Sequence, residues 1–329
     1  MNLAKSVLIT GGAGFIGSHL AESYLNAGVC VTVLDDLTTG SLRNIRHLIG
    51  QPGFEFRLGS VLDKQLCDQA VAECDDVIHL AAAVGVKMIF ERPTETIERN
   101  VRGTECVLEA ALRHGRKVFI ASTSEVYGKE PASNSSSFRE SHDITLGNSM
   151  RWCYACSKAL DEYLARAYFL NKGLPVVIGR FFNTVGPRQS GAYGMVVPRF
   201  VEWALKGKPL QVYGDGKQTR SFTHVSDVVA VVRALMSEPR AEGEVFNIGS
   251  TEGVTILDLA KRVIEFTDSR SEIVFMSYEQ AYGEGFEDIR NRVPDASRIE
   301  RLLNFRPRKT LDEILRDTIA SVTSDLVNA

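Results

Sequence analysis

The sequence predicts an α/β protein whose main domain is a parallel, doubly wound sheet, with a smaller α/β domain interleaved with it. Short, nearly continuous apolar strands alternate with helical segments, as in parallel sheets that are buried on both faces. From about residue 183 the texture changes, because residues 183–221 are rich in Gly, Pro and Arg. We therefore expect residues 1–182 plus about 222–250 to form the main domain, and about 183–221 plus 251–329 to form the second.

Each predicted element follows from its pattern and length. Apolar runs predict strands at residues 7–10, 30–34, 54–58, 76–80, 118–122, 176–181 and 245–249. Helix-forming stretches predict helices at residues 18–26, 94–113, 151–164, 223–236, 255–267 and 311–327. Thr255 and Asp258 have the spacing of a capping box, so we expect a helix to begin there.

Composition excludes several classes of function. Apolar residues make up 44% of the chain and charged residues 24%, as in ordinary globular proteins. The net charge of −3 gives no case for binding nucleic acid, and no apolar run approaches the roughly 18 residues of a membrane span. Six scattered cysteines include Cys153 and Cys156, but no second pair completes a metal site. We expect a cytoplasmic protein with reduced thiols, no metal, and no nucleic-acid or membrane partner.

A glycine-rich turn joins the first strand to the first helix. Gly11, Gly14 and Gly17 form a G-x-x-G-x-x-G pattern, and the next strand ends at Asp35 and Asp36. This order is that of a dinucleotide-binding βαβ unit, in which the helix N-terminus receives a pyrophosphate. We expect the Asp35 carboxylate to accept hydrogen bonds from ribose hydroxyls and to repel a 2′-phosphate, which favours NAD over NADP.

Polar residues follow two later strands. Asp63 comes after the third strand, where its carboxylate could meet the adenine amine or cap the next helix. Thr123 comes after the fifth strand, and ligands of open α/β sheets bind beyond the carboxyl ends of the strands. We therefore expect Thr123 to lie near the nicotinamide and to face Tyr154.

Tyr154 and Lys158 are four residues apart in a predicted helix, so their side chains project from one face. A phenol has an ordinary pKa of about 10 and needs a nearby cation to become a useful base. The pair therefore suits acid–base chemistry beside the nicotinamide, although an amphipathic helix could carry the same two residues without any function.

Ordered motifs along nearly the whole chain resemble the extended short-chain dehydrogenase/reductase family, and within it the nucleotide-sugar epimerases, dehydratases and decarboxylases. The matching motifs lie at residues 11–17, 100–104, 122–128, 154–158, 180–183, 186–188, 214–220 and 247–249. The resemblance implies a tightly bound NAD that is reduced and reoxidised in each cycle. It also implies that Tyr154 takes a proton from a sugar hydroxyl, that Lys158 holds the nicotinamide ribose and keeps Tyr154 ionisable, and that Thr123 binds the same hydroxyl.

The resemblance also implies residues for each part of the site. The cofactor set is Gly11, Gly14, Phe15, Ile16, Gly17, Asp35, Asp36, Asp63, Leu80, Ala81, Ala82, Asn100, Tyr154 and Lys158. The substrate set is Asn183, Arg188, Val197, Arg220, Arg292 and Asp295. The catalytic set is Tyr154, Lys158, Thr123, Ser124 and Glu125. Arginine forks suit the phosphate oxygens of a nucleotide diphosphate, although Arg220 and Arg292 could also be surface charges.

Glu125 separates the possible reactions. Simple 4-epimerases resembling this chain have a small or neutral residue there, whereas a Glu beside a 4-keto sugar allows proton chemistry at C5. The dTDP-glucose type of dehydratase has Asp at the position of Ser124, and the GDP-mannose type prefers NADP, which Asp35 disfavours. The decarboxylases resemble this chain at residues 123–128 and in having Ser221 after Arg220. Glu125 could alternatively be a carboxylate that caps a local turn.

Two features differ from the ordinary UDP-xylose synthases. Arg151 and Trp152 resemble the 4-amino-arabinose-pathway decarboxylase and the apiose synthases, and residues 82–87 resemble epimerases. Our first interpretation is a UDP-glucuronate decarboxylase that gives a UDP-pentose through a 4-keto intermediate. The alternative is a UDP-hexose or UDP-hexuronate 4-epimerase; a 4,6-dehydratase and a non-catalytic NAD-binding protein are further alternatives.

The resemblance finally implies a homodimer joined by a four-helix bundle. The helix near residues 101–113 and the Tyr154 helix would form it. We expect Leu160, Leu164, Ala167 and Tyr168 to be its outer face, although these residues could also face the home sheet.

Overall fold

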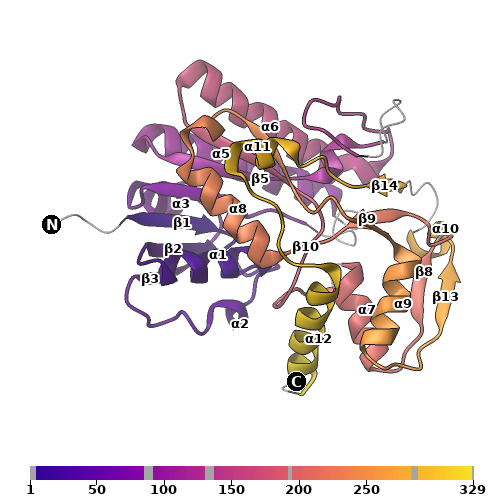
Figure 1. The fold of residues 1–329 in the computed structure, drawn as a ribbon. Helices are drawn as coiled ribbons and strands as arrows, with labels where there is room; N and C mark the ends of the chain where they lie inside the picture. Colours follow the sequence, from indigo (N-terminus) through magenta and orange to yellow (C-terminus); the bar gives the residue numbers. More distant parts are fainter. Residues whose placement is uncertain (1–4, 85–91, 130–136, 192–194, 283–287, 328–329) are drawn as a thin grey trace.

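The computed structural model describes residues 5–84, 92–129, 137–191, 195–282 and 288–327. At its centre lies a seven-stranded sheet in the order β11–β6–β5–β4–β1–β2–β3, in which every neighbouring pair is parallel. The strand order reverses beside β1, as in a doubly wound Rossmann-type sheet. Helices cover both faces of this sheet (Figure 1). The predicted α/β fold is therefore confirmed.

The strands of the large sheet lie where the apolar runs predicted them. They are β1 Ser6–Thr10, β2 Cys30–Asp35, β3 Phe54–Leu58, β4 Asp76–His79, β5 Lys117–Thr123, β6 Val176–Phe181 and β11 Val245–Ile248. The helices around it are α1 Phe15–Asn26, α2 Leu42–Ile45, α3 Lys64–Ala72, α5 Pro93–His114, α6 Cys153–Lys172, α8 Val225–Ser237 and α11 Ser297–Leu303. The sequence patterns did not indicate the short helices α2 and α11, and they indicated α3 only as a helix that Asp63 could cap.

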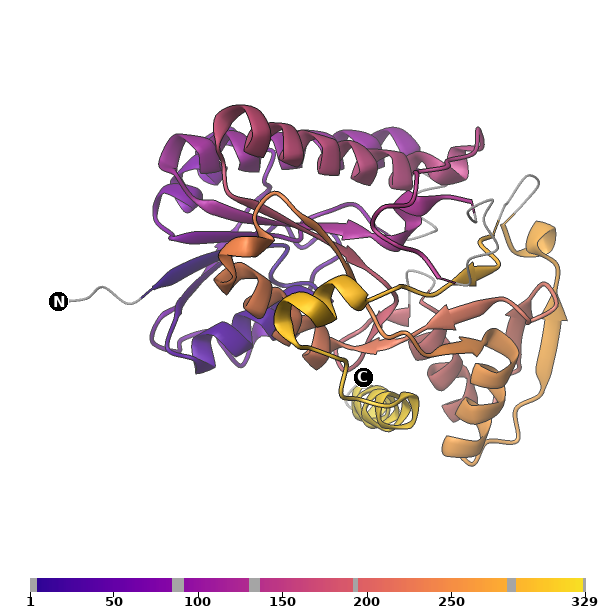
Figure 2. The ribbon, with the colours of Figure 1, turned by 45° about the horizontal axis from the view of Figure 1, so that its top comes forward.

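The large sheet separates two apolar cores. On one face, Leu20 of α1, Val228 of α8 and Ile299 of α11 are buried together. On the other face, α3, α5 and α6 bury side chains that include Val107 and Ala165. Figures 1 and 2 both show α5 and α6 side by side along this second face. The loops at the carboxyl ends of the strands thus belong to a sheet that is held rigidly from both sides.

A third core joins the C-terminal elements. Phe200, Leu259 and Leu315 are buried there, from α7, α9 and α12. The elements of this part are β7 Thr184–Val185, α7 Val196–Leu205, β8 Leu210–Tyr213, β9 Thr219–Ser221, β10 Thr223–His224, β12 Gly253–Thr255, α9 Ile256–Phe266, β13 Ile273–Met276, α10 Tyr278–Tyr282, β14 Asn291–Arg292 and α12 Leu311–Val327. β9 lies between antiparallel β12 and parallel β14, so it connects distant parts of the chain.

Local predictions in this part can be compared directly. The Thr255 hydroxyl accepts a hydrogen bond from the Asp258 amide at 3.0 Å, which confirms the predicted helix start. The division into two domains stays a prediction, and α11 packs against the large sheet although its residues fall in the predicted second domain. Residues 85–87 of the epimerase-like segment lie outside the described residues. Among the described helices, none is both long and apolar enough to cross a membrane.

Candidate active site

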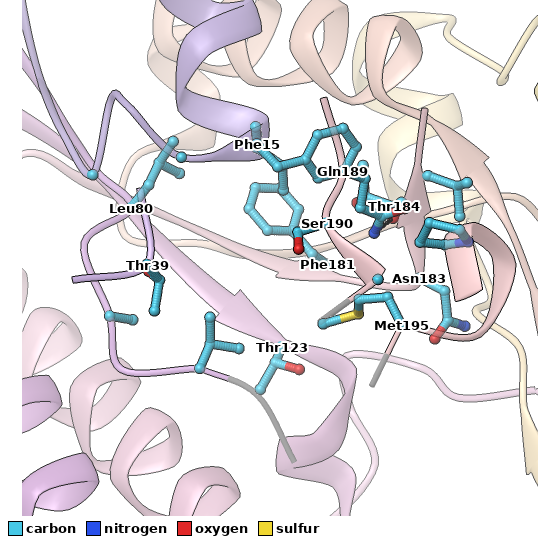
Figure 3. Close-up of a pocket in the computed structure, with 18 of the residues that line it drawn as sticks. Phe15, Thr39, Leu80, Thr123, Phe181, Asn183, Thr184, Gln189, Ser190 and Met195 are labelled. Atoms are coloured by element: carbon cyan, nitrogen blue, oxygen red, sulfur yellow. Dashed lines mark hydrogen bonds between the residues drawn. The ribbon is translucent and has the colours of Figure 1, made fainter. Parts of the chain in front are cut away.

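A cavity of about 1060 Å³ opens at the carboxyl ends of the strands of the large sheet. Its wall includes the glycine turn, the ends of β2, β4, β5 and β6, and side chains from the C-terminal part of the chain. In Figure 3, Thr39 and Leu80 lie toward the left, Asn183, Thr184 and Met195 toward the right, and Phe15 and Thr123 between the two groups. The cavity therefore runs from the predicted cofactor end to the predicted substrate end.

The glycine turn is shaped for a close ligand. Gly11 has φ of 70°, and a Cβ there would lie 2.7 Å from the Ala81 amide nitrogen. A Cβ on Gly17 would overlap the Gly11 carbonyl oxygen. Gly11, Gly14, Phe15, Ile16 and Gly17 all line the cavity at the start of α1. Only glycine allows this close backbone packing, and the start of α1 then offers free amides to a pyrophosphate.

Asp35 lies at the end of β2, where the sequence placed it. Its carboxylate accepts hydrogen bonds from the amides of Ala13 at 2.9 Å and Leu37 at 2.8 Å. Burial raises the pKa of Asp35, and these two amides oppose that rise. Each carboxylate oxygen can accept a second hydrogen bond, so a ribose hydroxyl can bind as well. Asp36 also lines the cavity and accepts a hydrogen bond from Arg99 at 3.2 Å.

Two predicted cofactor residues have structural positions instead. Asp63 caps α3, because its Oδ1 accepts from the amides of Gln65 and Leu66 at 3.1 Å, and it is not part of the cavity wall. Ser60, three residues earlier, does line the cavity. The side chain of Asn100 is buried, accepts a hydrogen bond from the Ala83 amide at 2.7 Å and donates one to Ser157 at 3.0 Å. Asn100 therefore joins the loop after β4 to α6, and lies behind the cavity wall. Leu80, Ala81 and Ala82, which were also predicted to bind the cofactor, line the cavity.

Tyr154 and Lys158 project from α6 into the cavity, together with Thr123 at the end of β5. The pKa of Tyr154 is raised by burial and then by the Glu125 and Asp161 carboxylates, while the Thr123 hydroxyl opposes the rise by hydrogen bonding. The Lys158 ammonium donates to Asp161 at 2.7 Å, and both side chains are buried. The structure thus shows a raised Tyr154 pKa and not the expected lowering, first because the phenol is buried and then because Glu125 and Asp161 lie near it.

Glu125 lies between two guanidinium groups. Arg151 donates to one carboxylate oxygen at 3.0 Å and Arg292 to the other at 3.1 Å. Burial opposes ionisation of Glu125, but the two arginines outweigh it and lower its pKa to about 2. Glu125 is thus ionised at neutral pH. The alternative in which Glu125 caps a turn is wrong, because the Thr123 hydroxyl accepts from the Glu125 amide and caps this turn.

The substrate end of the cavity is rich in arginine. Arg220 donates to Asp288 at 2.8 Å, and Arg292 donates to the Asn183 side chain at 2.5 Å. The Nε atom of Arg292 is buried without a hydrogen-bond partner among the described residues, and so is the Nε atom of Arg199. Burial and the neighbouring Arg220 lower the pKa of Arg292 to about 10, which still leaves it charged at neutral pH. Buried donors without partners are costly, and an anionic group of the substrate would satisfy them.

The remaining predicted substrate residues divide into two groups. Val197 and Arg188 line the cavity, and Arg188 donates to Glu22 of α1 at 2.6 Å. Asp295 is not part of the wall, because its carboxylate accepts from Arg139 at 2.9 Å and from the Ser297 amide at 2.9 Å. Ser124, which was predicted to be catalytic, lines the cavity beside Glu125.

Several wall residues were not named as site residues from the sequence. Arg151 was noted only as an unusual residue, and Ser60, Asp288 and Tyr278 were not noted. The Tyr278 hydroxyl donates to Asp288 at 2.7 Å, so this pair joins Arg220 at the substrate end. Only Arg151 had a sequence signal, its place just before the Tyr154 helix. Among the described residues, no group of His, Cys, Asp and Glu could hold a metal ion.

The fold and this site together define a class: a dinucleotide-binding sheet whose Tyr, Lys and Thr meet an arginine-lined site for an anionic substrate. Residues 8–318 match the family model described as GDP-mannose 4,6 dehydratase. The chain belongs to this family, a branch of the extended short-chain dehydrogenases/reductases, which confirms the resemblance.

Relatives within the family include decarboxylases. The chain is 44% identical to UDP-N-acetyl-alpha-D-glucosaminuronate decarboxylase of Bacillus cytotoxicus, over 96% of this chain and 97% of that protein. It is 36% identical to UDP-glucuronic acid decarboxylase 1 of Xenopus tropicalis, over 96% of this chain and 71% of that protein. The structure of UDP-glucuronic acid 4-epimerase from Bacillus cereus, in complex with UDP-glucuronic acid and NAD, has a TM-score of 0.87 and 28% identity, over 97% of this chain and 99% of that one.

Proposed function

We propose that this protein is an NAD-dependent decarboxylase of UDP-hexuronates that works through a 4-keto sugar and gives a UDP-sugar one carbon shorter. Relatives of 35–44% identity over most of the chain are named as decarboxylases of UDP-glucuronic acid or of UDP-N-acetyl-alpha-D-glucosaminuronate. The identity is higher, at 44%, to the decarboxylase of UDP-N-acetyl-alpha-D-glucosaminuronate, which favours a uronate with a 2-acetamido group as the better substrate. UDP-glucuronate is the other substrate to test.

The observation that carries this proposal is the Arg151–Glu125–Arg292 cluster beside Tyr154. Two positive groups face one carboxylate, so the cluster has one surplus positive charge for a carboxylate of the substrate. A neutral hexose offers no partner for that charge. Tyr154 and Thr123 can hold the C4 hydroxyl, and Glu125 lines the same cavity, where it can act on the sugar.

The residues at the other end of the cavity fit NAD. The Gly11 and Gly17 backbone leaves no room for a Cβ, and Asp35 is anchored where a ribose hydroxyl would bind. When bound there, NAD supplies hydride acceptance and return at C4 of the sugar. Lys158 is the residue that would hold the nicotinamide ribose, and Phe15 and Leu80 border the same space.

The test is product analysis with purified protein. We expect incubation with UDP-N-acetylglucosaminuronate or UDP-glucuronate to release CO2 and to give a UDP-sugar that lacks the carboxylate, as identified by NMR. Inversion at C4 with the carboxylate retained would instead show a 4-epimerase. If the protein turned over UDP-glucose and neither UDP-uronate, the result would contradict both the proposal that the substrate is a uronate and the proposal that the arginine cluster binds its carboxylate.

We also propose a homodimer that forms through α5 and α6. Leu160 and Tyr163 of α6 are 49% and 63% exposed, and Ile97 of α5 is 38% exposed. Part of the predicted outer face is different, because Tyr168 is buried and Leu164 packs against the home core. The exposed apolar residues that remain support burial against a second copy. Six free cysteines support a reducing compartment, and we propose the cytoplasm.

A further inference from the structure

A second buried carboxylate lies beside the catalytic helix residues and has no role in the function described so far. Asp161 follows Lys158 by three residues, and its Oδ2 accepts a hydrogen bond from the Lys158 ammonium at 2.7 Å. The Asp161 side chain is 0% exposed and the Lys158 side chain 3% exposed. The other oxygen, Oδ1, is buried and has no hydrogen-bond partner within 3.5 Å among the described residues, although the Thr104 hydroxyl of α5 is near enough to Asp161 to act on its pKa. Burying such a carboxylate is costly, so its presence beside Lys158 calls for a reason.

The surroundings of the pair and of Tyr154 come from five further elements. From α5, Thr104 opposes the burial that raises the pKa of Asp161, and from β4 the His79 ring contacts Thr104 at 3.3 Å. Burial and Lys158 lower the pKa of His79 to about 3, so His79 is neutral and adds no charge. The groups facing Tyr154 from the other side are Thr123 of β5, Glu125 of η1 (Ser124–Tyr127) and Arg292 of β14.

The adjacent carboxylate, Glu162, has different partners from Asp161. Glu162 is also buried on α6, but Arg180 donates to it at 2.6 and 2.9 Å and Ser122 donates to it as well. The charge of Glu162 is therefore balanced by Arg180 within the core. Asp161 has Lys158 as its only ion-pair partner among the described residues, so its charge acts directly on the Tyr154–Lys158 pair.

We propose that Asp161 is a positioning residue that pairs the Lys158 ammonium and thereby raises the affinity of the Tyr154 oxygen for its proton. Its use follows from the proposed function, on which this inference rests. In a cycle without net redox change, the ionised Tyr154 oxygen first takes the proton of the C4 hydroxyl; it later gives a proton back to the same sugar oxygen and is ionised again. A tyrosine made strongly acidic by an unpaired lysine would ionise easily but would take the proton of the C4 hydroxyl poorly. Asp161 shifts this balance toward uptake of that proton.

The experiment titrates Tyr154 in the full chain, without substrate or added cofactor. Tyrosinate absorbance is recorded from neutral pH to about pH 11 for the natural protein and for Asp161→Asn, each against the same protein with Tyr154→Phe. We expect no Tyr154 signal in the natural protein. In Asp161→Asn we expect Tyr154 to ionise within this range. Its pKa would then be lower than in the natural protein by about one unit or more, which is a change of at least about tenfold in the ionisation equilibrium.

The matched control is Glu162→Gln, which removes the adjacent buried carboxylate. It should lower stability and leave the Tyr154 titration as in the natural protein. Asp161→Glu should restore the natural titration. Equal titrations of Asp161→Asn and the natural protein, or an equal shift in Glu162→Gln, would overturn the proposal.

A double variant keeps the proposal testable where Asp161→Asn does not fold. Lys158→Met with Asp161→Asn removes both charges and leaves no unpaired buried ion. If the pair acts on Tyr154 as a neutral unit, this variant titrates like the natural protein; a titration different from it contradicts the proposal. Because the readout uses no substrate, its outcome is independent of whether the protein decarboxylates a UDP-uronate.

Discussion

Exchange of Glu125 for glutamine tests the centre of the proposed site. The substitution keeps the shape of the side chain and removes its charge, so Arg151 and Arg292 face a neutral amide. The fall of the Glu125 pKa from 4.5 to about 2 corresponds to about 3 kcal/mol of net stabilisation of the ionised form. We expect Glu125→Gln to lower the free energy of unfolding at pH 7 by about this amount.

The pH dependence has a defined sign. Since the pKa of Glu125 is lower in the folded protein, its contribution is fully present above pH 4.5 and is lost as the pH falls toward about 2. The difference in unfolding free energy between the natural protein and Glu125→Gln should therefore become smaller as the pH is lowered from 7. Urea unfolding at several pH values measures it. Asp312→Asn, which breaks an exposed pair with Arg262, should cost no more than about 1 kcal/mol.

Activity supplies the second readout for Glu125→Gln. In the proposed function, removal of hydride at C4 depends on Tyr154 and Thr123, whereas the later steps depend on the Glu125 cluster. We expect reduced nicotinamide to form on mixing with a UDP-uronate, while formation of the final product falls by roughly 10²–10⁴. Full product formation with an unchanged unfolding free energy would refute the reasoning, because Glu125 would then be neither a catalytic residue nor a stabilising ion.

Other predictions concern the cofactor, the common chemical step and the dimer. Tyr154→Phe should slow turnover roughly 10²–10⁴-fold and should abolish formation of reduced nicotinamide, as measured by stopped-flow absorbance. Gly17→Ala should weaken NAD binding at least about tenfold by fluorescence titration, because its Cβ overlaps the backbone of the glycine turn; unchanged affinity would contradict the predicted site. Asp35→Asn should reduce the preference for NAD over NADP in the same titration, and an unchanged ratio would remove Asp35 from cofactor selection. Leu160→Glu should shift the light-scattering mass from dimer to monomer, whereas a natural protein that is already monomeric would eliminate the dimer proposal.

Local spacing was sufficient to predict the parts of the site that lie in one segment. The spacing of Gly11, Gly14 and Gly17 after a strand predicted a dinucleotide-binding turn. The four-residue spacing of Tyr154 and Lys158 predicted that both side chains project from one face of a helix. Asp63 shows where this information ends, because an acid after a strand can contact adenine or cap a helix. In the structure its carboxylate caps α3, and Ser60 lines the cavity.

Contacts between distant segments could not be predicted in the same way. Asp295 follows β14 and was expected at the substrate, but Arg139 reaches it from a segment 156 residues earlier. Arg151 was visible as an unusual residue, whereas its partner Glu125 lies 26 residues away and becomes adjacent only through packing of η1 against α6. The spacing of Lys158 and Asp161 could be read from the sequence, but the burial that gives this pair its importance could not.

The charges around Tyr154 explain why the cavity suits decarboxylation in particular. The positive groups are Arg151, Arg292 and Lys158, and the negative groups are Glu125 and Asp161. The sum is therefore +3 − 2 = +1, and a substrate carboxylate would neutralise it. When a 4-keto uronate loses CO2, its negative charge is not lost but moves from the carboxylate to the oxygen at C4, where Tyr154 can return a proton. A fixed surplus charge stabilises this anion throughout the step. A 4-epimerase of neutral sugars never forms this anion, so its site has no need of the surplus charge.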